Sequence, residues 1–304
     1  MNLTNDTLAK NILRVVAYFD LFDYPLTAKQ IFQFLPQNSV STDDVNNAVA
    51  RLVDSRMLYA EGGYFYLPSS NINIVQQRVE NERRAKRKLA IARCVSAFIK
   101  RFPFVRAVFL TGSLSKHVSP LASDIDFMVV TAKGRLWICR TLLTAFRRIF
   151  LFGSRKFFCT NYYVTENGYL HSRQNIYTAL EVATTKVVWN ESAFAEFQLR
   201  NGWIKEFLPN YIPETEKNLL LSPSRSVIQR WCESLLEIFP LHRLENALME
   251  IHRRHWQKKF HQVGNKRFEI MFMISPDTSA CWSNDHQQPV LVQYHRKLSS
   301  LGLE

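Results

Sequence analysis

The sequence lacks the features that would place it in a membrane or in an oxidising compartment. It has no run of about 18 apolar residues, the length that spans a bilayer, so we expect no membrane span. Residues 1–10 are polar and do not resemble a secretory signal. The five cysteines are scattered and form no C-x-x-C pair. We therefore expect a cytoplasmic protein with reduced, mostly buried thiols rather than a disulfide or zinc framework.

The eight histidines also lack the spacing of a metal site. His252 and His255 are three positions apart in a basic segment, and we interpret them as surface residues. His117 lies in the loop after a Gly-Ser turn and could contact phosphate, although a loop histidine is usually just exposed. The Asp285-His286 pair could indicate acid–base chemistry, but a helix N-cap is the simpler interpretation.

The formal net charge of +13 is unevenly distributed along the 304 residues. Residues 1–68 contain five Lys or Arg against seven Asp or Glu, a net charge of −2. The positive excess therefore lies downstream, with clusters at Arg83–Lys88 and Arg253–Arg267. Such clusters fit a polyanionic partner such as a nucleoside triphosphate or RNA, although each alone is equally consistent with a solvated helix face.

Residues 108–130 carry the main chemical signal of the chain. An apolar run, Val108–Leu110, ends at Thr111-Gly112-Ser113, and Asp124-Ile125-Asp126 precedes a second apolar run. Short apolar runs bounded by Gly, Ser and Pro indicate buried strands. Because side chains alternate along a strand, we expect Asp124 and Asp126 to point one way and Ile125 to point into the core.

This pattern favours a site for a cation and phosphate. Two neighbouring carboxylates repel each other unless a cation lies between them, and such oxygen ligands suit Mg²⁺ or Mn²⁺. Gly112 allows the backbone to approach a ligand closely, and the N–H groups of Gly112 and Ser113 suit a phosphate oxygen. Lys116 could add a positive charge. The competing interpretation is a loop with a capping serine and two solvated aspartates.

Gly112, Ser113, Asp124 and Asp126 resemble the motif of the nucleotidyltransferase superfamily, which has the DNA polymerase β-like fold. The superfamily resemblance covers about residues 105–165. Weaker motifs over most of 70–304 look like a bacterial branch whose substrates the sequence does not identify. The resemblance implies that Asp124 and Asp126 bind the metal, and that a nucleoside triphosphate is the substrate.

The chain departs from the family pattern at the third predicted strand, 156–165. Many members carry a third carboxylate there, usually the general base, and the closest counterpart here is Asn161. An amide cannot act as that base. Three explanations remain open: two aspartates suffice, another acid such as Glu181 or Glu166 serves, or the site is impaired.

The periodicity predicts an α+β protein in three parts. Residues 1–68 read as three helices, the first capped by Asn5 or Asp6, and a β-hairpin, which resembles a winged helix-turn-helix. Residues 70–173 form a small mixed-sheet nucleotidyltransferase core flanked by helices. Residues 174–304 are expected to form a helical substrate-binding region, with helices over 175–188, from 192 to about 207, and over 225–260, where Pro240 kinks or splits the helix. A last helix is expected over 289–298, capped by Ser283, Asn284 or Asp285.

These observations predict a metal-dependent nucleotidyltransferase that moves a nucleoside monophosphate from a nucleoside triphosphate to a hydroxyl acceptor. RNA or another polyanion is a candidate acceptor. The alternative is a catalytically silent protein of the same fold that binds a ligand or regulates a partner. DNA binding by residues 1–68 is disfavoured, because an acidic module lacks the counterion release that drives nucleic-acid binding.

Overall fold

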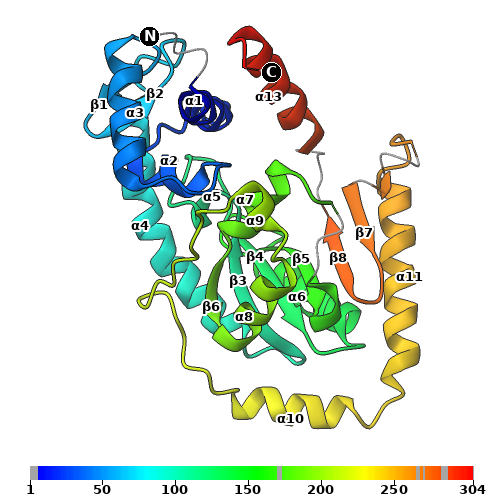
Figure 1. The fold of residues 1–304 in the computed structure, drawn as a ribbon. Helices are drawn as coiled ribbons and strands as arrows, with labels where there is room; N and C mark the ends of the chain where they lie inside the picture. Colours follow the sequence, from blue (N-terminus) through cyan, green and yellow to red (C-terminus); the bar gives the residue numbers. More distant parts are fainter. Residues whose placement is uncertain (1–5, 170–172, 265–267, 270, 282–286, 304) are drawn as a thin grey trace.

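The protein has an α+β fold built on one six-stranded sheet (Figure 1). The structure is a computed structural model, and it describes residues 6–169, 173–264, 268–269, 271–281 and 287–303. The strand order is β6-β3-β4-β5-β8-β7, so the chain's first two core strands lie inside the sheet. The strands are β3 (Val105–Thr111), β4 (Asp126–Thr131), β5 (Cys159–Thr165), β6 (Lys186–Trp189), β7 (Phe272–Ile274) and β8 (Thr278–Cys281).

One parallel pair organises the centre of the sheet. β4 and β5 run parallel, and helix α6 (Leu136–Phe150) makes the crossover between them, as parallel neighbours require. The other pairs, β3 with β4 and β6, β5 with β8, and β7 with β8, are antiparallel. The short connection between antiparallel β3 and β4 therefore carries residues 112–125 over one end of the sheet.

The N-terminal module has the predicted three helices and hairpin. Each helix begins at a side-chain cap: Asp6, Thr27 and Ser41 accept hydrogen bonds from first-turn N–H groups. The elements are α1 (Thr7–Asp20), α2 (Ala28–Phe34), α3 (Thr42–Asp54), β1 (Tyr59–Glu61) and β2 (Tyr64–Tyr66). Asn5, the alternative cap of the first helix, lies outside the described residues.

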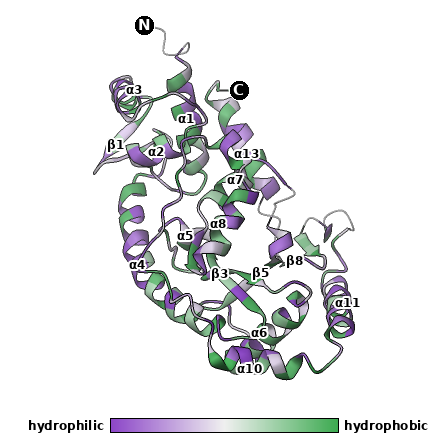
Figure 2. Ribbon diagram, turned by 60° about the horizontal axis from the view of Figure 1, so that its bottom comes forward, coloured by the Kyte–Doolittle hydropathy of each residue, from purple (hydrophilic) through white to green (hydrophobic). Residues whose placement is uncertain are grey.

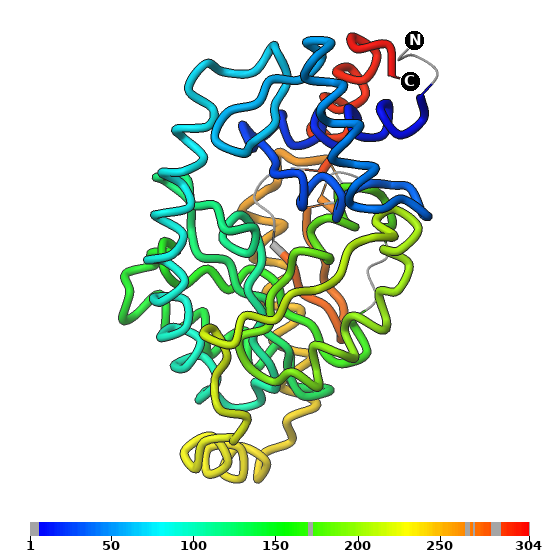
Figure 3. The backbone as a smooth tube through the Cα atoms, turned by 60° about the vertical axis from the view of Figure 1, so that its left-hand side comes forward, coloured from blue at the N-terminus to red at the C-terminus, as the bar shows by residue number. Residues whose placement is uncertain are grey.

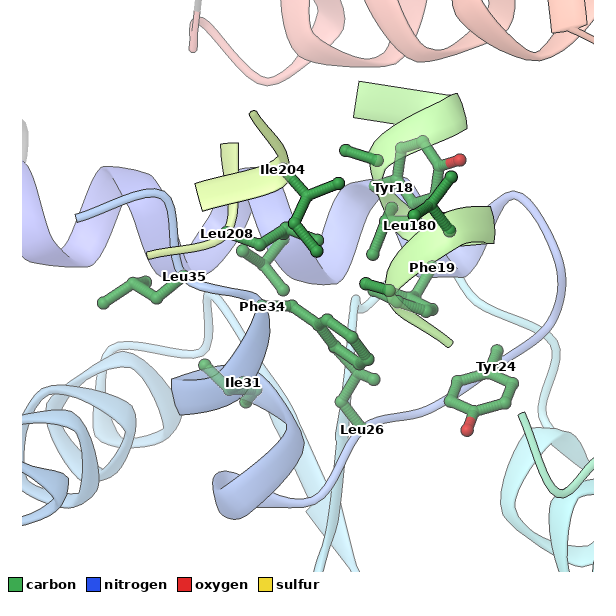
Figure 4. Packing of buried hydrophobic residues seen from close by; sticks show 14 of the residues in the cluster. Tyr18, Phe19, Tyr24, Leu26, Ile31, Phe34, Leu35, Leu180, Ile204 and Leu208 are labelled. Atoms are coloured by element: carbon green, nitrogen blue, oxygen red, sulfur yellow. The ribbon is translucent and has the colours of Figure 1, made fainter. Parts of the chain in front are cut away.

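One face of the sheet shares its core with this module. Apolar side chains of β3, β4 and β5 belong to the same buried cluster as residues of α1 and α2. Figure 4 shows Phe34 of α2 beside Phe19 of α1 and close to Leu208, with Leu180 and Ile204 from the later helices above it. The rings of Phe19 and Phe34 have centroids 4.8 Å apart. The module is therefore packed onto the sheet side of the molecule rather than held on a linker.

The other face of the sheet is covered by long helices. The buried cluster there joins Phe127 and Tyr163 of the sheet to α4 (Ile74–Ile99), α6 and α11 (Leu241–Lys259). α4 and α11 lie on the outside and carry many hydrophilic residues (Figure 2). The remaining elements are α5 (Gly112–Ser115), the 3₁₀ turn η2 (Glu166–Gly168), α7 (Ile176–Ala183), α8 (Glu191–Arg200), α9 (Ile204–Phe207), α10 (Val227–Leu236) and α13 (Gln287–Ser300).

The two ends of the described chain lie side by side (Figure 3). Arg14 of α1 donates two hydrogen bonds, of 2.9 and 2.8 Å, to the carbonyl oxygen of Leu303. The ring of Tyr18 meets that of Tyr294 in α13 edge-on, with centroids 5.2 Å apart. The last helix thus stabilises the first.

The region after residue 174, which we expected to be helical, contributes strands as well as helices. β6, β7 and β8 all come from that region and form half of the sheet. The expected helix over 175–188 ends at Ala183, and Lys186–Trp189 pairs with β3 instead. Strands this short carry too little periodicity to stand out beside helices. Pro240 does split 225–260, because it caps α11, whereas Ser283, Asn284 and Asp285, the predicted caps of the last helix, lie outside the described residues.

Among the described residues, no helix combines the length and the apolar character that a bilayer crossing demands. The predicted strand pattern around residues 105–131 is present in the fold, with the second strand beginning at Asp126 rather than Asp124.

Candidate active site

A pocket of about 780 Å³ lies where the β3–β4 connection meets the N-terminal module. The sheet contributes residues of β3, β4 and β5 to its wall, and α1 and α7 contribute the opposite side. The sequence-predicted site residues that line it are Gly112, Ser113, Lys116, Asp124 and Asp126. The fold therefore brings all five together in one cavity.

Gly112 is held directly against Asp126. Thr111 pairs with Asp126 in the β3–β4 ladder, so Gly112 begins the turn beside the carboxylate. Its φ of +71° is in the left-handed region, and a Cβ built there would be 2.6 Å from Asp126 Oδ2. Glycine is thus required for two reasons, the backbone conformation and the close approach of the carboxylate.

The side chains of the segment that carries the two aspartates alternate between the two sides of the sheet, as expected. Ile125 and Phe127 are fully buried in the cluster on the α6 side of the sheet. Asp124 and Asp126, next-but-one neighbours, both line the pocket on the other side. Although Asp124 precedes β4, the backbone is fixed there: Ile125 N–H donates to the carbonyl of Lys156 at 3.0 Å. The pair is thus held between β4 and the segment before β5.

Burial raises the pKa of Asp126 above its ordinary value. A hydrogen bond from the Cys159 thiol acts in the opposite direction, while the negative charges of Asp124 and Glu181 raise the pKa further. The same carboxylate raises the pKa of Cys159, whose own burial is the larger cause. A charged Asp126 is therefore costly in the empty fold, and a bound cation would relieve that cost.

An irregularity in the pairing of β5 with β4 places Asn161 beside Asp126. Phe127 pairs with Thr160 but Met128 pairs with Tyr162, so Asn161 is an extra residue in the strand. Its side chain turns into the pocket, where Nδ2 donates to Asp126 Oδ1 at 3.1 Å. Asn161 is therefore a hydrogen-bond donor to Asp126 in the same pocket.

The side chain of Lys116 forms an ion pair and a hydrogen bond within the pocket. Its Nζ is 2.8 Å from Glu181 Oε1 and donates to the carbonyl oxygen of Gly112 at 3.3 Å. Glu181, on α7, also lines the pocket, whereas Glu166 lies in η2 and is not among the described lining residues. Of the two substitute acids considered from the sequence, Glu181 alone is in position among the described residues.

An aromatic wall faces the acidic side of the pocket, and sequence reasoning missed it. Tyr18, Phe22 and Tyr24 come from the N-terminal module, and Tyr177 comes from α7. Tyr24 also donates from its hydroxyl to the carbonyl oxygen of Lys116 at 2.9 Å, so the module contacts the site loop directly. The three module residues precede Asp124 by 100 or more positions, and Tyr177 follows Asp126 by 51, so no local motif signals them.

A lysine of α4 supports the loop before the aspartates. Lys88 Nζ donates to the carbonyl oxygen of Ser123 at 2.5 Å and to its hydroxyl at 3.1 Å. Burial and the neighbouring Lys156 lower the pKa of Lys88, while Asp124 and Asp126 act to raise it. One member of the basic cluster that the sequence showed at 83–88 thus stands next to the carboxylates.

The donor set fits a hard divalent cation held together with a phosphate ligand. Among the described residues, no group of three or more His, Cys, Asp and Glu side chains is placed to hold a metal alone. Mg²⁺ commonly takes only one or two protein carboxylates and completes its shell with water and substrate phosphates. Asp124 and Asp126 supply that number.

Comparison with known proteins finds no match to this chain among protein-family models, curated proteins or solved structures. We therefore infer the function from the pocket and the motif that lines it.

Proposed function

We propose that the protein is a metal-dependent nucleotidyltransferase, with Asp124 and Asp126 as its metal ligands. The observation that carries this proposal is the close approach of Gly112 to Asp126, with Asp124 in the same pocket. That arrangement puts a turn with backbone N–H groups beside two carboxylates, one of which is costly to leave charged without a cation. The resemblance of the motif to the superfamily points to the same assignment.

In this proposal each residue has a distinct task. Bound Mg²⁺ supplies charge neutralisation for the triphosphate. The N–H groups of Gly112 and Ser113 bind oxygens of the β- and γ-phosphates, because first-turn N–H groups of α5 have no partner within the helix. Of the aromatic residues that line the pocket, Phe22 is 47% exposed and offers a face for the base. Catalysis is then mainly positioning and electrostatic stabilisation.

The transfer step itself is a displacement at the α-phosphorus. A hydroxyl oxygen of the acceptor forms the new bond to phosphorus, the bond to the bridging oxygen of the β-phosphate breaks, and pyrophosphate leaves. Asn161 cannot take the hydroxyl proton. Glu181 is the described carboxylate in the pocket that is available for that role, once a phosphate competes with it for Lys116.

Calorimetry with ATP, GTP, CTP and UTP tests the proposal. We expect at least one triphosphate to bind wild-type protein in the presence of Mg²⁺, and binding to be lost when Mg²⁺ is omitted or when Asp126→Asn is used. Asp54→Asn, the same change at an exposed carboxylate that is not among the described lining residues, serves as the folded control. If Asp126→Asn bound the triphosphate without metal as tightly as wild type does with Mg²⁺, the aspartates would not be part of the binding site.

A catalytically silent binding protein is the second candidate, because Asn161 stands where many members of the superfamily carry the base. The Lys116–Glu181 ion pair favours the same reading, since it occupies the acid that could replace that base. The two candidates differ in one result. Metal-dependent binding of a triphosphate, without pyrophosphate release in the presence of any acceptor, is expected only of the silent protein.

We further propose that the N-terminal module is a winged-helix-like contact and positioning element rather than a DNA reader. Its third helix exposes Asp43 and Asp44 in the first turn, and Asp54 is also exposed. Its α1 residues instead face the pocket and the last helix. Duplex DNA should therefore show no salt-dependent binding that is lost on substitution of Arg51 and Arg56, the two basic residues of this helix and its end.

A further inference from the structure

A second cavity, also about 780 Å³, lies between α6 and α11, and we call it the basic groove. Five of its lining residues are cationic, and no Asp or Glu is among the described residues that line it. The cations are Arg140, Arg147, Arg148, Arg155 and Lys259. A cavity lined by one sign of charge attracts and concentrates ligands of the opposite sign.

Ion pairing does not neutralise this charge within the described part of the chain. Arg147, Arg148, Arg155 and Lys259 form none of the ion pairs found there, whereas Arg254, on an outer face of the same helix α11, pairs with Glu250 at 2.9 Å. Arg147 instead donates to the carbonyl oxygen of Gly153 at 2.8 Å, and burial together with Arg155 lowers its pKa. The groove thus holds cations close enough to repel each other.

The pKa of His252 depends on the electrostatic potential inside the groove. Its Nε2 is 3.0 Å from Thr141 Oγ1, and it is partly buried rather than on the surface, where the sequence placed it. Burial, followed by the charges of Arg140, His255 and Arg148, lowers the pKa of His252 to about 4. An anion in the groove would offset those charges and raise this pKa.

The basic groove adjoins the pocket that is lined by Asp124 and Asp126, which we call the acidic pocket. Arg155, Cys159 and Asn161 line both cavities, so the two share the wall on which Asn161 contacts Asp126. The groove also has an exposed apolar side made by Ile149 of α6 and Ile251 of α11, whose side chains are 66% and 59% exposed. Cations beside exposed apolar side chains suit a ligand that carries both phosphates and flat apolar groups.

We propose that the basic groove binds the end of a single-stranded oligonucleotide and brings its terminal hydroxyl to Asp126. The phosphates contact Arg148, Arg155 and Lys259, and the bases cover the apolar side of the groove. The identification of this strand as the acceptor rests on the proposed function, whereas the binding itself does not. Inorganic phosphates share the anionic chemistry but cannot use the apolar side.

Fluorescence anisotropy with a 5′-labelled oligouridylate tests the proposal on the full chain without Mg²⁺. We expect Arg148→Gln combined with Lys259→Gln to weaken binding by at least about tenfold at moderate salt. The slope of log K against log salt should become shallower by about 1.4, since each neutralised phosphate contributes about 0.7 for single strands. Equal affinity and slope in wild type and double variant would overturn the proposal.

Two controls distinguish binding in the groove from general attraction of an anion to a basic surface. Arg254→Gln removes a charge from the same helix outside the groove, and its affinity should stay within about twofold of wild type, in line with a screened surface charge. Tripolyphosphate should compete only weakly. A loss with Arg254→Gln as large as with the double variant, or tripolyphosphate binding as tight as the oligouridylate, would overturn the assignment.

A titration of the imidazole signals of His252 by NMR locates the ligand. The oligouridylate should raise the pKa of His252 in wild type, and an unmoved pKa at saturation would place the strand elsewhere. Asp126→Asn should retain oligouridylate binding and the response of His252. If the triphosphate fails to bind while this response remains, the nucleotidyltransferase proposal fails and the oligonucleotide site stands.

Discussion

At the scale of the residue, the site depends on how closely one glycine and one carboxylate approach. Gly112 directly follows β3 and Asp126 begins the neighbouring strand β4, so their proximity follows from local sequence. For this reason the motif could be predicted from the residues alone. From the sequence, Asn161 could be named only as the residue that corresponds to the superfamily's third carboxylate. Its role as a donor to Asp126 depends on an extra residue in β5 that no pattern in the sequence indicates.

The substitution Gly112→Ala should abolish metal-dependent triphosphate binding. The added Cβ would lie 2.6 Å from Asp126 Oδ2, and the φ of +71° would add backbone strain of about 1 kcal/mol or more. Calorimetry with Mg²⁺ and urea unfolding measure the two effects. Gly134→Ala is the matched control, because it has a φ of +65° with nothing within 4 Å, and so shows the strain without the contact. Unchanged triphosphate binding in Gly112→Ala would contradict the geometry.

The substitution Asn161→Asp should make the protein more dependent on a divalent cation. A third carboxylate would stand about 3 Å from Asp126 Oδ1, where repulsion destabilises the metal-free fold. Bound Mg²⁺ would then stabilise the variant more than wild type, since a ligand that binds only the folded state raises its stability.

Thermal unfolding with and without Mg²⁺ provides the measurement for this variant. Asn161→Ala removes the hydrogen bond without adding charge, so it should show no larger response to Mg²⁺ than wild type. An Asn161→Asp variant whose Tm is insensitive to Mg²⁺ would argue against a cation between Asp124 and Asp126.

At the scale of the element, the segment between α9 and α10 is fixed by one carboxylate. Glu216 Oε1 is 2.6 Å from Lys186 Nζ of β6 and 3.1 Å from His117 Nε2 in the site loop. His117 therefore contacts Glu216, and it is not among the described residues that line the acidic pocket. Burial would raise the pKa of Glu216, but the hydrogen bonds from His117 and Lys186 outweigh it and lower the pKa to about 2.

The substitution Glu216→Gln should lower the free energy of unfolding at pH 7 by about 1–3 kcal/mol, because it leaves Lys186 without its charged partner. A carboxyl with a depressed pKa stabilises the fold above its unfolded value of 4.5 and loses that contribution as the pH falls toward about 2. The difference between wild type and variant should therefore be full at pH 7 and shrink below about pH 4.5.

Urea unfolding across this pH range measures the difference. Glu214→Gln is the control in the same segment, because Glu214 pairs with Lys29 on the surface and its loss should cost less than about 1 kcal/mol. A Glu216→Gln difference that grows as the pH falls would contradict the assigned ion pairs.

The sequence predicts most helices well and the outer strands poorly. The sequence indicates helices over about 75–101 and about 135–151, stopped by Pro103 and Gly153, and the ends of α4 and α6 fall within two residues of these ranges. β6, β7 and β8 are three or four residues long, and their place at the sheet edges is decided by partners far along the chain. A local pattern cannot specify such pairing, which is why the sheet appeared smaller from sequence than it is.

At the scale of the whole molecule, the N-terminal module and the sheet share one core. Phe34 of α2 lies close to Leu208, and Tyr24 holds the site loop through its hydroxyl (Figure 4). The aromatic wall of the acidic pocket exists only because the module packs there. Sequence analysis could divide the chain into parts, but it could not show that one part completes the pocket of another, since those contacts join distant residues.

The substitution Ile204→Ala should destabilise the module and the sheet together. Ile204 is buried in the shared cluster, and the lost side chain should cost about 2–5 kcal/mol. Hydrogen exchange should then accelerate to the same extent in peptides from α1 and from β4. Leu199→Ala, at a side chain that is 77% exposed on α8, should leave both rates unchanged. Faster exchange in α7 and α9 alone, with α1 unaffected, would show that the module is independent.

The most direct test of the account is the position of a metal ion in crystals grown with Mn²⁺ and a non-hydrolysable nucleoside triphosphate. The account predicts an anomalous peak between Asp124 and Asp126, within about 2.2 Å of an oxygen from each, and triphosphate oxygens at the N–H groups of Gly112 and Ser113. A triphosphate bound away from Gly112, or a Mn²⁺ peak with neither aspartate as a ligand, would contradict it.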